Sequence, residues 1–228
     1  RLMSGGGGMM RMEINSDNQN GVPLNFGGRQ NGIMTNYAGG VNFNKDISKK
    51  TQLTSSYFYN RLDQNVRQQT QRINYLPNDS SYNYAENVEQ MNASDNHRAN
   101  LVIDHKIDSA NSIKSTTSLS YSDSELNSQT NSQTTTLNET LQNTSSRTNY
   151  NTQTNANLNS SLLYRHRFAK KGRTISTNMT LGFTQTRSSG SQQSLNEYYT
   201  AIPEKREILQ TNSQSNDYQS YGVTFSYT

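Results

Sequence analysis

The sequence predicts an all-β fold, namely an antiparallel segment of a transmembrane β-barrel with about seven long strands. Two observations predict this fold. First, apolar residues recur at every second position in seven windows of about nine to eleven residues, the length that crosses a bilayer at a tilt. Second, short turns alternate with long polar connections, as they do in outer-membrane barrels.

The composition fits a sheet with one apolar face better than a packed soluble domain. Asn, Ser, Thr and Gln make up about 45% of the 228 residues, hydrophobic residues 29% and charged residues 17%. A soluble domain is about 45–50% apolar and about 25% charged. A disordered chain usually has few aromatic residues and a high net charge, whereas this chain has 14 Tyr and a net charge of +4.

Several classes of protein are excluded or disfavoured. The chain has no Cys, which excludes disulfides, zinc–thiolate sites and cysteine nucleophiles. It also has no apolar run near 18 residues, the length of a membrane-spanning helix. The 21 Lys and Arg are scattered, so the pI near 9.2 does not predict a nucleic-acid partner. His97, His105 and His166 do not have metal-ligand spacing, and no nucleophile elbow is present, so we expect no enzyme activity, metal or cofactor.

The chain divides into two parts. Residues 1–32 contain the run Gly5–Gly8 and predict a Gly-rich extracellular loop, and no Gly-Lys-Ser/Thr ending makes it a phosphate-binding loop. Residues 33–228 predict the partial outer-membrane β-barrel.

The seven windows lie near residues 35–43, 53–60, 98–107, 113–121, 156–168, 175–183 and 221–228. Because strand side chains alternate between two faces, the apolar residues of each window share a face. In a barrel wall that face contacts lipid. The residues expected to face lipid are Val41, Phe43, Leu53, Tyr57, Leu101, Ile103, Leu119, Leu162, Tyr164, Leu181, Phe183, Val223 and Phe225. Phe58, Val102 and Leu163 break the alternation.

The predicted connections have two lengths. Hairpin-length turns are expected at Lys45–Lys50, Asp108–Asn111 and Ala169–Gly172, about 60 residues apart. Longer polar links are expected near 62–97, 122–155 and 184–218. Parts of these links, Gln64–Asn74, Ser124–Thr136 and Thr144–Asn155, are expected to be strand extensions that continue into solvent.

The opposite face of the windows is predicted to look into a wet lumen. Arg98, Arg165 and Arg167 lie on this face and are candidates for lining a pore or contacting a plug. Lys49–Lys50 and Lys170–Lys171 lie in short turns, where they are either simply solvated or contact a periplasmic partner or anionic lipid headgroups.

Three segments resemble the barrel of TonB-dependent outer-membrane receptors: Gly32–Arg61, Asn96–Ser122 and Asn159–Phe183. The resemblance implies a bacterial outer-membrane protein that imports a ligand through a large barrel, commonly of 22 strands, with an N-terminal plug gated by TonB. This chain shows no recognisable plug or TonB box, so we expect it to be a fragment of such a barrel. The implied partners are outer-membrane lipid, the rest of the barrel and its plug, and TonB through a missing N-terminal part.

Other interpretations remain open at this stage. A fibrous extracellular adhesin or surface-structural protein would share the Asn, Ser and Thr bias, although it should show a repeat of about 20–25 residues. A complete eight-stranded barrel would take its extra strand from the region of Met10, Met12 and Ile14. A disordered segment is disfavoured by the seven alternating windows.

Overall fold

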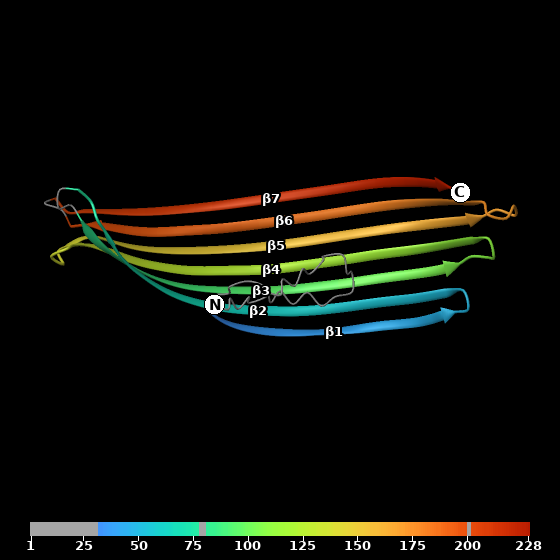
Figure 1. Cartoon of the computed structure of the whole chain (residues 1–228), viewed down its shortest axis with the longest axis horizontal. Coiled ribbons are helices and arrows are strands. Elements are labelled where there is room, and N and C mark those ends of the chain that lie inside the picture. Colours follow the sequence, from blue (N-terminus) through green and yellow to red (C-terminus); the bar gives the residue numbers. More distant parts are fainter. Residues whose placement is uncertain (1–31, 78–80, 200–201) are drawn as a thin grey trace, which may run out of the picture. The chain divides into compact units, whose positions relative to one another are not determined.

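The computed structural model describes residues 32–77, 81–199 and 202–228, and these form one antiparallel sheet of seven strands. The sheet order follows the chain, so each strand pairs with the strands before and after it (Figure 1). The prediction of an all-β chain with about seven long strands is confirmed. The strands are β1 (Ile33–Ser48), β2 (Thr51–Asn74), β3 (Tyr82–Lys106), β4 (Asn111–Thr136), β5 (Leu141–Arg167), β6 (Thr174–Tyr198) and β7 (Glu204–Tyr227). The Gly-rich loop predicted at residues 1–32 lies outside the described residues, apart from Gly32.

The three predicted short turns are confirmed, and they lie at the same end of the sheet, here called the hairpin end (Figure 1). β1 and β2 are joined by Lys49 and Lys50 alone, since β1 continues through most of the predicted turn. The other two turns are 107–110, between β3 and β4, and 168–173, between β5 and β6.

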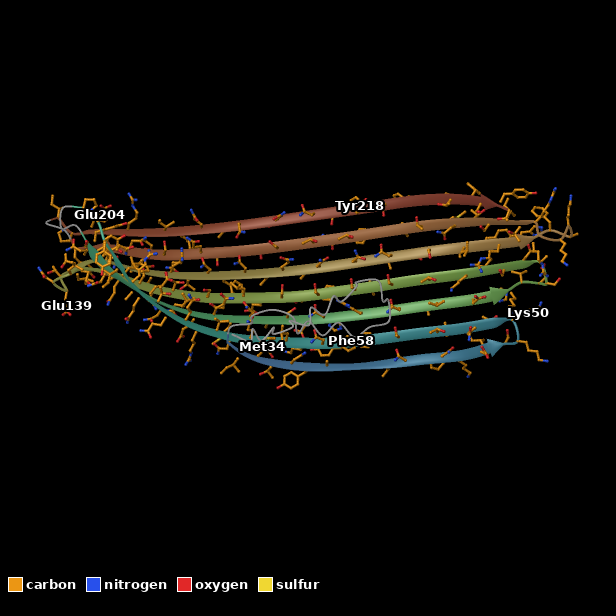
Figure 2. The ribbon with its side chains drawn as sticks, viewed as in Figure 1. Met34, Lys50, Phe58, Glu139, Glu204 and Tyr218 are labelled. Atoms are coloured by element: carbon orange, nitrogen blue, oxygen red, sulfur yellow. The ribbon has the colours of Figure 1, made fainter. Side chains whose placement is uncertain are left out.

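The long links predicted near 62–97, 122–155 and 184–218 are wrong, because most of their residues belong to strands. The connections at this opposite end, here called the loop end, span only 75–81, 137–140 and 199–203. Figure 2 labels Lys50 at the hairpin end, and Glu139 and Glu204 at the loop end. Amide and hydroxyl side chains tolerate an extended backbone whose N–H and C=O groups are paired with a neighbour.

Strands β2 to β7 are 24 to 27 residues long. At about 3.4 Å per residue, such a strand reaches roughly 80–90 Å, nearly three times the thickness of a bilayer core. The predicted strand extensions at 64–74, 124–136 and 144–155 are confirmed. The apolar windows therefore fill only the part of each strand nearest the hairpin end.

The strand register places the apolar windows side by side. One row across the sheet pairs Val41 with Tyr57, Tyr57 with Ala99, Ala99 with Leu119, Leu119 with Leu158, and Leu158 with Phe183. Paired residues point to the same face, so this row defines what is here called the apolar face, and the other is the polar face.

No layer of the described structure covers either face. Among the described residues no hydrophobic side chain is buried, and the buried residues are the small hydroxyl residues Ser128, Thr130 and Ser194, together with Gly182. The sheet is therefore held together by its backbone ladders and cross-strand side-chain pairs, without a hydrophobic core.

The exceptions to the alternation, Phe58, Val102 and Leu163, lie on the polar face. Phe58 lies beside Gly40 of β1: a Cβ added at Gly40 would be 3.0 Å from the Phe58 ring and 2.9 Å from the Tyr57 carbonyl oxygen. The missing side chain of Gly40 leaves the space that this aromatic ring uses. The neighbouring Gly39, on the apolar face, has open space around it.

Two turns depend on specific residues. In the turn after β3, the Asp108 carboxylate accepts hydrogen bonds from the backbone N–H groups of Ala110 and Asn111, both at 2.7 Å, and from the Asn111 amide. In the turn after β5, Gly172 has a φ of 85°, which favours glycine. Asp and Gly are common turn residues for these two reasons.

Candidate functional site

The strongest candidate functional surface is an exposed apolar band that crosses the sheet near the hairpin end. All thirteen residues predicted to face lipid lie on the apolar face. Phe225 is 72% exposed, Val41 67% and Leu119 47%, and ten of the thirteen are large hydrophobic side chains with at least 37% exposure. A continuous exposed apolar surface of this kind marks a site where protein or lipid binds.

An aromatic row borders the band on the side of the loop end. It consists of Tyr57, Tyr59, His97 and Tyr121, from three adjacent strands. The His97 ring centroid lies 5.0 Å from that of Tyr59 and 6.1 Å from that of Tyr121. The Tyr57 hydroxyl is 2.8 Å from Nδ1 of His97. This row combines apolar rings with polar groups, as residues at the border between hydrocarbon and water do.

A second aromatic row borders the band at the hairpin end. It consists of Tyr164, His166, Phe168 and Tyr227. Phe168 contacts His166 edge-on with ring centroids 4.7 Å apart, and its ring lies 6.3 Å from that of Tyr227. Asn111 accepts a hydrogen bond from the Tyr164 hydroxyl at 2.6 Å and lies 2.7 Å from Nδ1 of His166. Aromatic girdles at both borders are a feature of transmembrane barrels.

Charged groups begin directly beyond the first aromatic row, on the same face. Arg61 donates to both carboxylate oxygens of Asp63, at 3.0 and 3.1 Å, and to Asp95 at 2.9 Å. The Tyr59 hydroxyl donates to Asp95 at 2.5 Å. The apolar band therefore ends sharply, at a network of ionised groups that is suited to water and not to hydrocarbon.

The polar face opposite the band is lined by amides and hydroxyls that bond across strands. Asn96 donates to Asn60 at 3.1 Å, and Asn60 in turn donates to Asn36. Asn100 donates to Ser56 at 3.2 Å. These bonds join β1, β2 and β3 through side chains as well as through the backbone, and they satisfy groups that would be costly to place in lipid.

The three arginines predicted to face a lumen lie on the polar face but are not brought together. Arg98 of β3 is the register partner of Phe58 on β2 and of Ser120 on β4. This position is far along the strands from Arg165 and Arg167. Arg165 and Arg167 lie at the end of β5, where Arg167 donates to the carbonyl oxygen of Ser109 at 2.7 Å. They form no compact anion site among themselves.

The outer part of the sheet contains shallow polar grooves. One groove of about 610 Å³ is lined by the side chains of Arg67, Gln69, Glu89, Gln129 and Asn131, among others. Tyr84, near the start of β3, donates to Glu86 at 2.7 Å, and this hydrogen bond together with burial raises the pKa of the tyrosine. Sequence analysis did not single out these groove residues, since polar residues in a polar stretch give no pattern.

The histidines and carboxylates of the described residues do not gather into a metal site. No group of three or more His, Asp and Glu residues could hold a metal ion in that part of the chain. Each histidine has a structural partner: Thr51 for His105, Tyr57 for His97 and Asn111 for His166. In the described residues, no helix is long and apolar enough to span a membrane.

No protein-family model matches the chain, and no curated protein sequence matches it. The functional argument therefore depends on the apolar band, its two aromatic rows and the polar face behind it.

Proposed function

We propose that this chain is part of the wall of an outer-membrane β-barrel in a TonB-dependent-receptor-like protein that imports an unidentified ligand. The observation that carries the proposal is the exposed apolar band, which runs across all seven strands. An aromatic row borders it toward the loop end on β2 to β4, and a second borders it toward the hairpin end along β5 and β7. The resemblance of Gly32–Arg61, Asn96–Ser122 and Asn159–Phe183 to such receptors suggests the transport role.

The band has the dimensions that a membrane requires. On β3 it runs from His97 to His105, which at about 3.4 Å per residue is roughly 27–30 Å along the strand. A strand tilted by about 40° would cover roughly 20–25 Å of bilayer with this length, close to the apolar height of outer-membrane barrels.

Transfer of the band into lipid supplies the free energy that the sheet lacks in water. A large apolar side chain gains about 2 kcal/mol when all of it leaves water, and the band side chains are on average about half exposed, so the thirteen together gain on the order of 10 kcal/mol. This is comparable to the whole net stability of a typical soluble domain, about 5–15 kcal/mol. Lipid therefore replaces the missing hydrophobic core.

The two edge strands favour a larger barrel. Within the described residues, β1 pairs only with β2, and β7 pairs only with β6. In hydrocarbon an unpaired strand edge leaves backbone N–H and C=O groups without partners, at a cost of several kcal/mol each. Further strands of the same barrel would pair with both edges, and the polar face would then line the lumen around a plug.

Tryptophan fluorescence tests the membrane orientation, because this chain contains no Trp. Leu119→Trp places the probe on the apolar face, and Ser118→Trp places it one residue away on the polar face. In vesicles that contain brominated phospholipid, we expect strong quenching of Leu119→Trp and little quenching of Ser118→Trp. Aqueous iodide should give the opposite order.

Equal access of iodide to both probes, with no quenching by lipid, would overturn the membrane proposal and favour the fibrous surface protein. The receptor part is tested separately, by crosslinking of the whole protein to TonB in cells. A barrel wall that inserts in lipid while the whole protein never crosslinks to TonB would remove the TonB-dependent part of the proposal and keep the barrel.

A further inference from the structure

The hairpin end carries a concentrated positive charge, here called the basic rim. Residues 49–50, 106–110 and 165–173 contain eight of the chain's 21 Lys and Arg but only one of its 17 Asp and Glu, so the rim has a formal charge of +7. The net charge of the whole chain is +4, so the remainder carries −3. The rim cations are Lys49, Lys50, Lys106, Arg165, Arg167, Lys170, Lys171 and Arg173. The expectation that the basic residues are scattered is wrong, because the fold gathers turns that are about 60 residues apart.

The rim is a continuous structure, since its turns are hydrogen-bonded to one another. The backbone N–H of Lys106 donates to the carbonyl oxygen of Lys50 at 2.8 Å, and Nζ of Lys50 donates to the carbonyl oxygen of Ile107 at 2.9 Å. Arg167 of β5 is bonded to the turn between β3 and β4. Its backbone N–H donates to the carbonyl oxygen of Ala110 at 2.8 Å, and its guanidinium donates to the carbonyl oxygen of Ser109.

Within the described residues no rim cation forms a salt bridge with a carboxylate, although the charge of Lys50 adds to the hydrogen bonds that lower the pKa of Asp108. The salt bridges in that part of the chain involve Arg61, Arg67, Lys205 and Arg206, which all lie outside the rim. All eight rim cations are exposed. Such a concentration of exposed cations beside a single carboxylate creates a field that attracts anions and opposes the stability of the free sheet.

The position of the rim identifies the anion. Along β5 the second aromatic row lies between the apolar band and the turn after β5, and Phe168 of that row is followed within this turn by Lys170 and Lys171. If the band spans hydrocarbon and the aromatic row lies at its border, the rim lies at the depth of the headgroups. Long Lys and Arg side chains at this depth extend toward lipid phosphates.

We propose that the basic rim, through its turn residues Lys49, Lys50, Lys170, Lys171 and Arg173, binds the headgroups of anionic phospholipids in the leaflet that borders the hairpin end. This inference rests on the proposed function, because it requires the band to be embedded in lipid. Each cation near an anionic surface strengthens association about fivefold. The rim therefore selects anionic over zwitterionic lipid around the hairpin end and fixes which end of the band faces that leaflet.

The test uses the protein reconstituted in vesicles of phosphatidylcholine and phosphatidylglycerol, with one of the two lipids brominated at a time. Phe168→Trp reports on lipid beside the rim, and Tyr121→Trp reports on lipid at the opposite border of the band. From the quenching of Phe168→Trp, we expect phosphatidylglycerol to associate with the protein at least about fivefold more strongly than phosphatidylcholine. From the quenching of Tyr121→Trp, we expect the two lipids to associate equally. High salt should weaken the preference.

Charge removal completes the test. In the Phe168→Trp background, replacement of Lys49, Lys50, Lys170 and Lys171 by Gln should bring the preference close to one. The control replaces Lys205 and Arg206, which already have carboxylate partners at the loop end, and should leave the preference unchanged.

Two outcomes would overturn the inference while leaving the barrel intact: equal association of both lipids at Phe168→Trp, or full loss of the preference when millimolar inorganic phosphate competes. A control in vesicles of the same composition uses Leu119→Trp with only the phosphatidylcholine brominated. Quenching of this tryptophan would show that the band is embedded in lipid. Failure of that quenching would instead remove the proposed function.

Discussion

Phe58 of β2 lies beside Gly40 of β1 on the polar face. A Cβ added at Gly40 would be 3.0 Å from the ring of Phe58 and 2.9 Å from the backbone oxygen of Tyr57. Part of this close approach involves backbone, which cannot rotate away as a side chain can. The pair therefore fixes where two strands meet, and it explains why an aromatic residue is placed on an otherwise polar surface.

We expect Gly40→Ala to destabilise the sheet by about 1–2 kcal/mol, as overpacking does. Gly39→Ala is the matched control, because its added Cβ meets nothing within 4 Å; it should be neutral or slightly stabilising. Urea unfolding of both variants in vesicles would measure the difference. Equal effects of the two substitutions would contradict the contact between Phe58 and Gly40.

A charge on the apolar face should be far more costly than the same charge on the polar face. We expect Leu119→Arg to lower the free energy of unfolding in lipid by about 2–4 kcal/mol, the cost of Arg near the midplane of a bilayer. Ser118→Arg, its neighbour on the polar face, should change that free energy by less than about 0.5 kcal/mol. Similar costs for both substitutions would mean that lipid does not contact the apolar face.

The turn after β3 should depend on pH. Hydrogen bonds from the Asn111 side chain, and from the backbone N–H groups of Ala110 and Asn111, lower the pKa of Asp108 below its ordinary value of 3.8. A lowered pKa in the folded state means that this stabilisation is fully present above the ordinary value and is lost as the pH falls through the folded-state pKa.

The pH dependence of the turn would be measured by amide hydrogen exchange at Ala110 and Asn111, corrected for the intrinsic pH dependence of exchange. Protection of these amides should be constant near neutral pH and fall below about pH 4. In Asp108→Ala, protection should already be weak at pH 7 and should not change across the acidic range. An unchanged acidic transition in the variant would assign it to another carboxyl group.

Arg61, at the border of the band, should contribute more to the stability of the sheet than Arg67, which lies further toward the loop end. Arg61 holds Asp63 and Asp95 at 3.0 and 2.9 Å, whereas Arg67 lies 3.6 Å from Glu89 and its side chain is 76% exposed. We expect Arg61→Ala to lower the midpoint of thermal unfolding, and Arg67→Ala to lower it less, since water screens the more exposed ion pair of Arg67 more strongly. Thermal unfolding of the two variants in vesicles would compare them.

The windows were predictable because a period of two is visible wherever apolar and polar residues alternate. Val41, Tyr57 and Leu119 could be assigned to one face from the sequence, and the register then placed them in one row. The turn at Asp108 was equally visible, because its residues favour a turn locally.

The outer strands could not be bounded in this way. In β4, Ser128 is buried and Gln129 is exposed, yet both residues are polar, so their alternation leaves no trace in the sequence. The sequence pattern accordingly predicts a long link over the polar residues of β6 and β7 beyond the band. Only their backbone pairing, which is not local, makes them strands.

The basic rim and the Gly40 contact were missed for a related reason. Lys50 and Ile107 are 57 residues apart in the chain, and no feature of either segment indicates that they are hydrogen-bonded. The cluster of five cations in 165–173 was a signal that sequence analysis passed over. Contacts between neighbouring strands depend on register, which a single sequence specifies only where one face is apolar.

The strict neighbour-to-neighbour order of the sheet affects how such a wall can change over generations. Each strand contacts only the strands before and after it in the chain. A gene duplication or deletion that added or removed one whole hairpin would therefore alter the circumference of the barrel and leave the remaining pairings intact. A wall of this kind can acquire a wider or narrower bore in steps of two strands, without rebuilding a shared core.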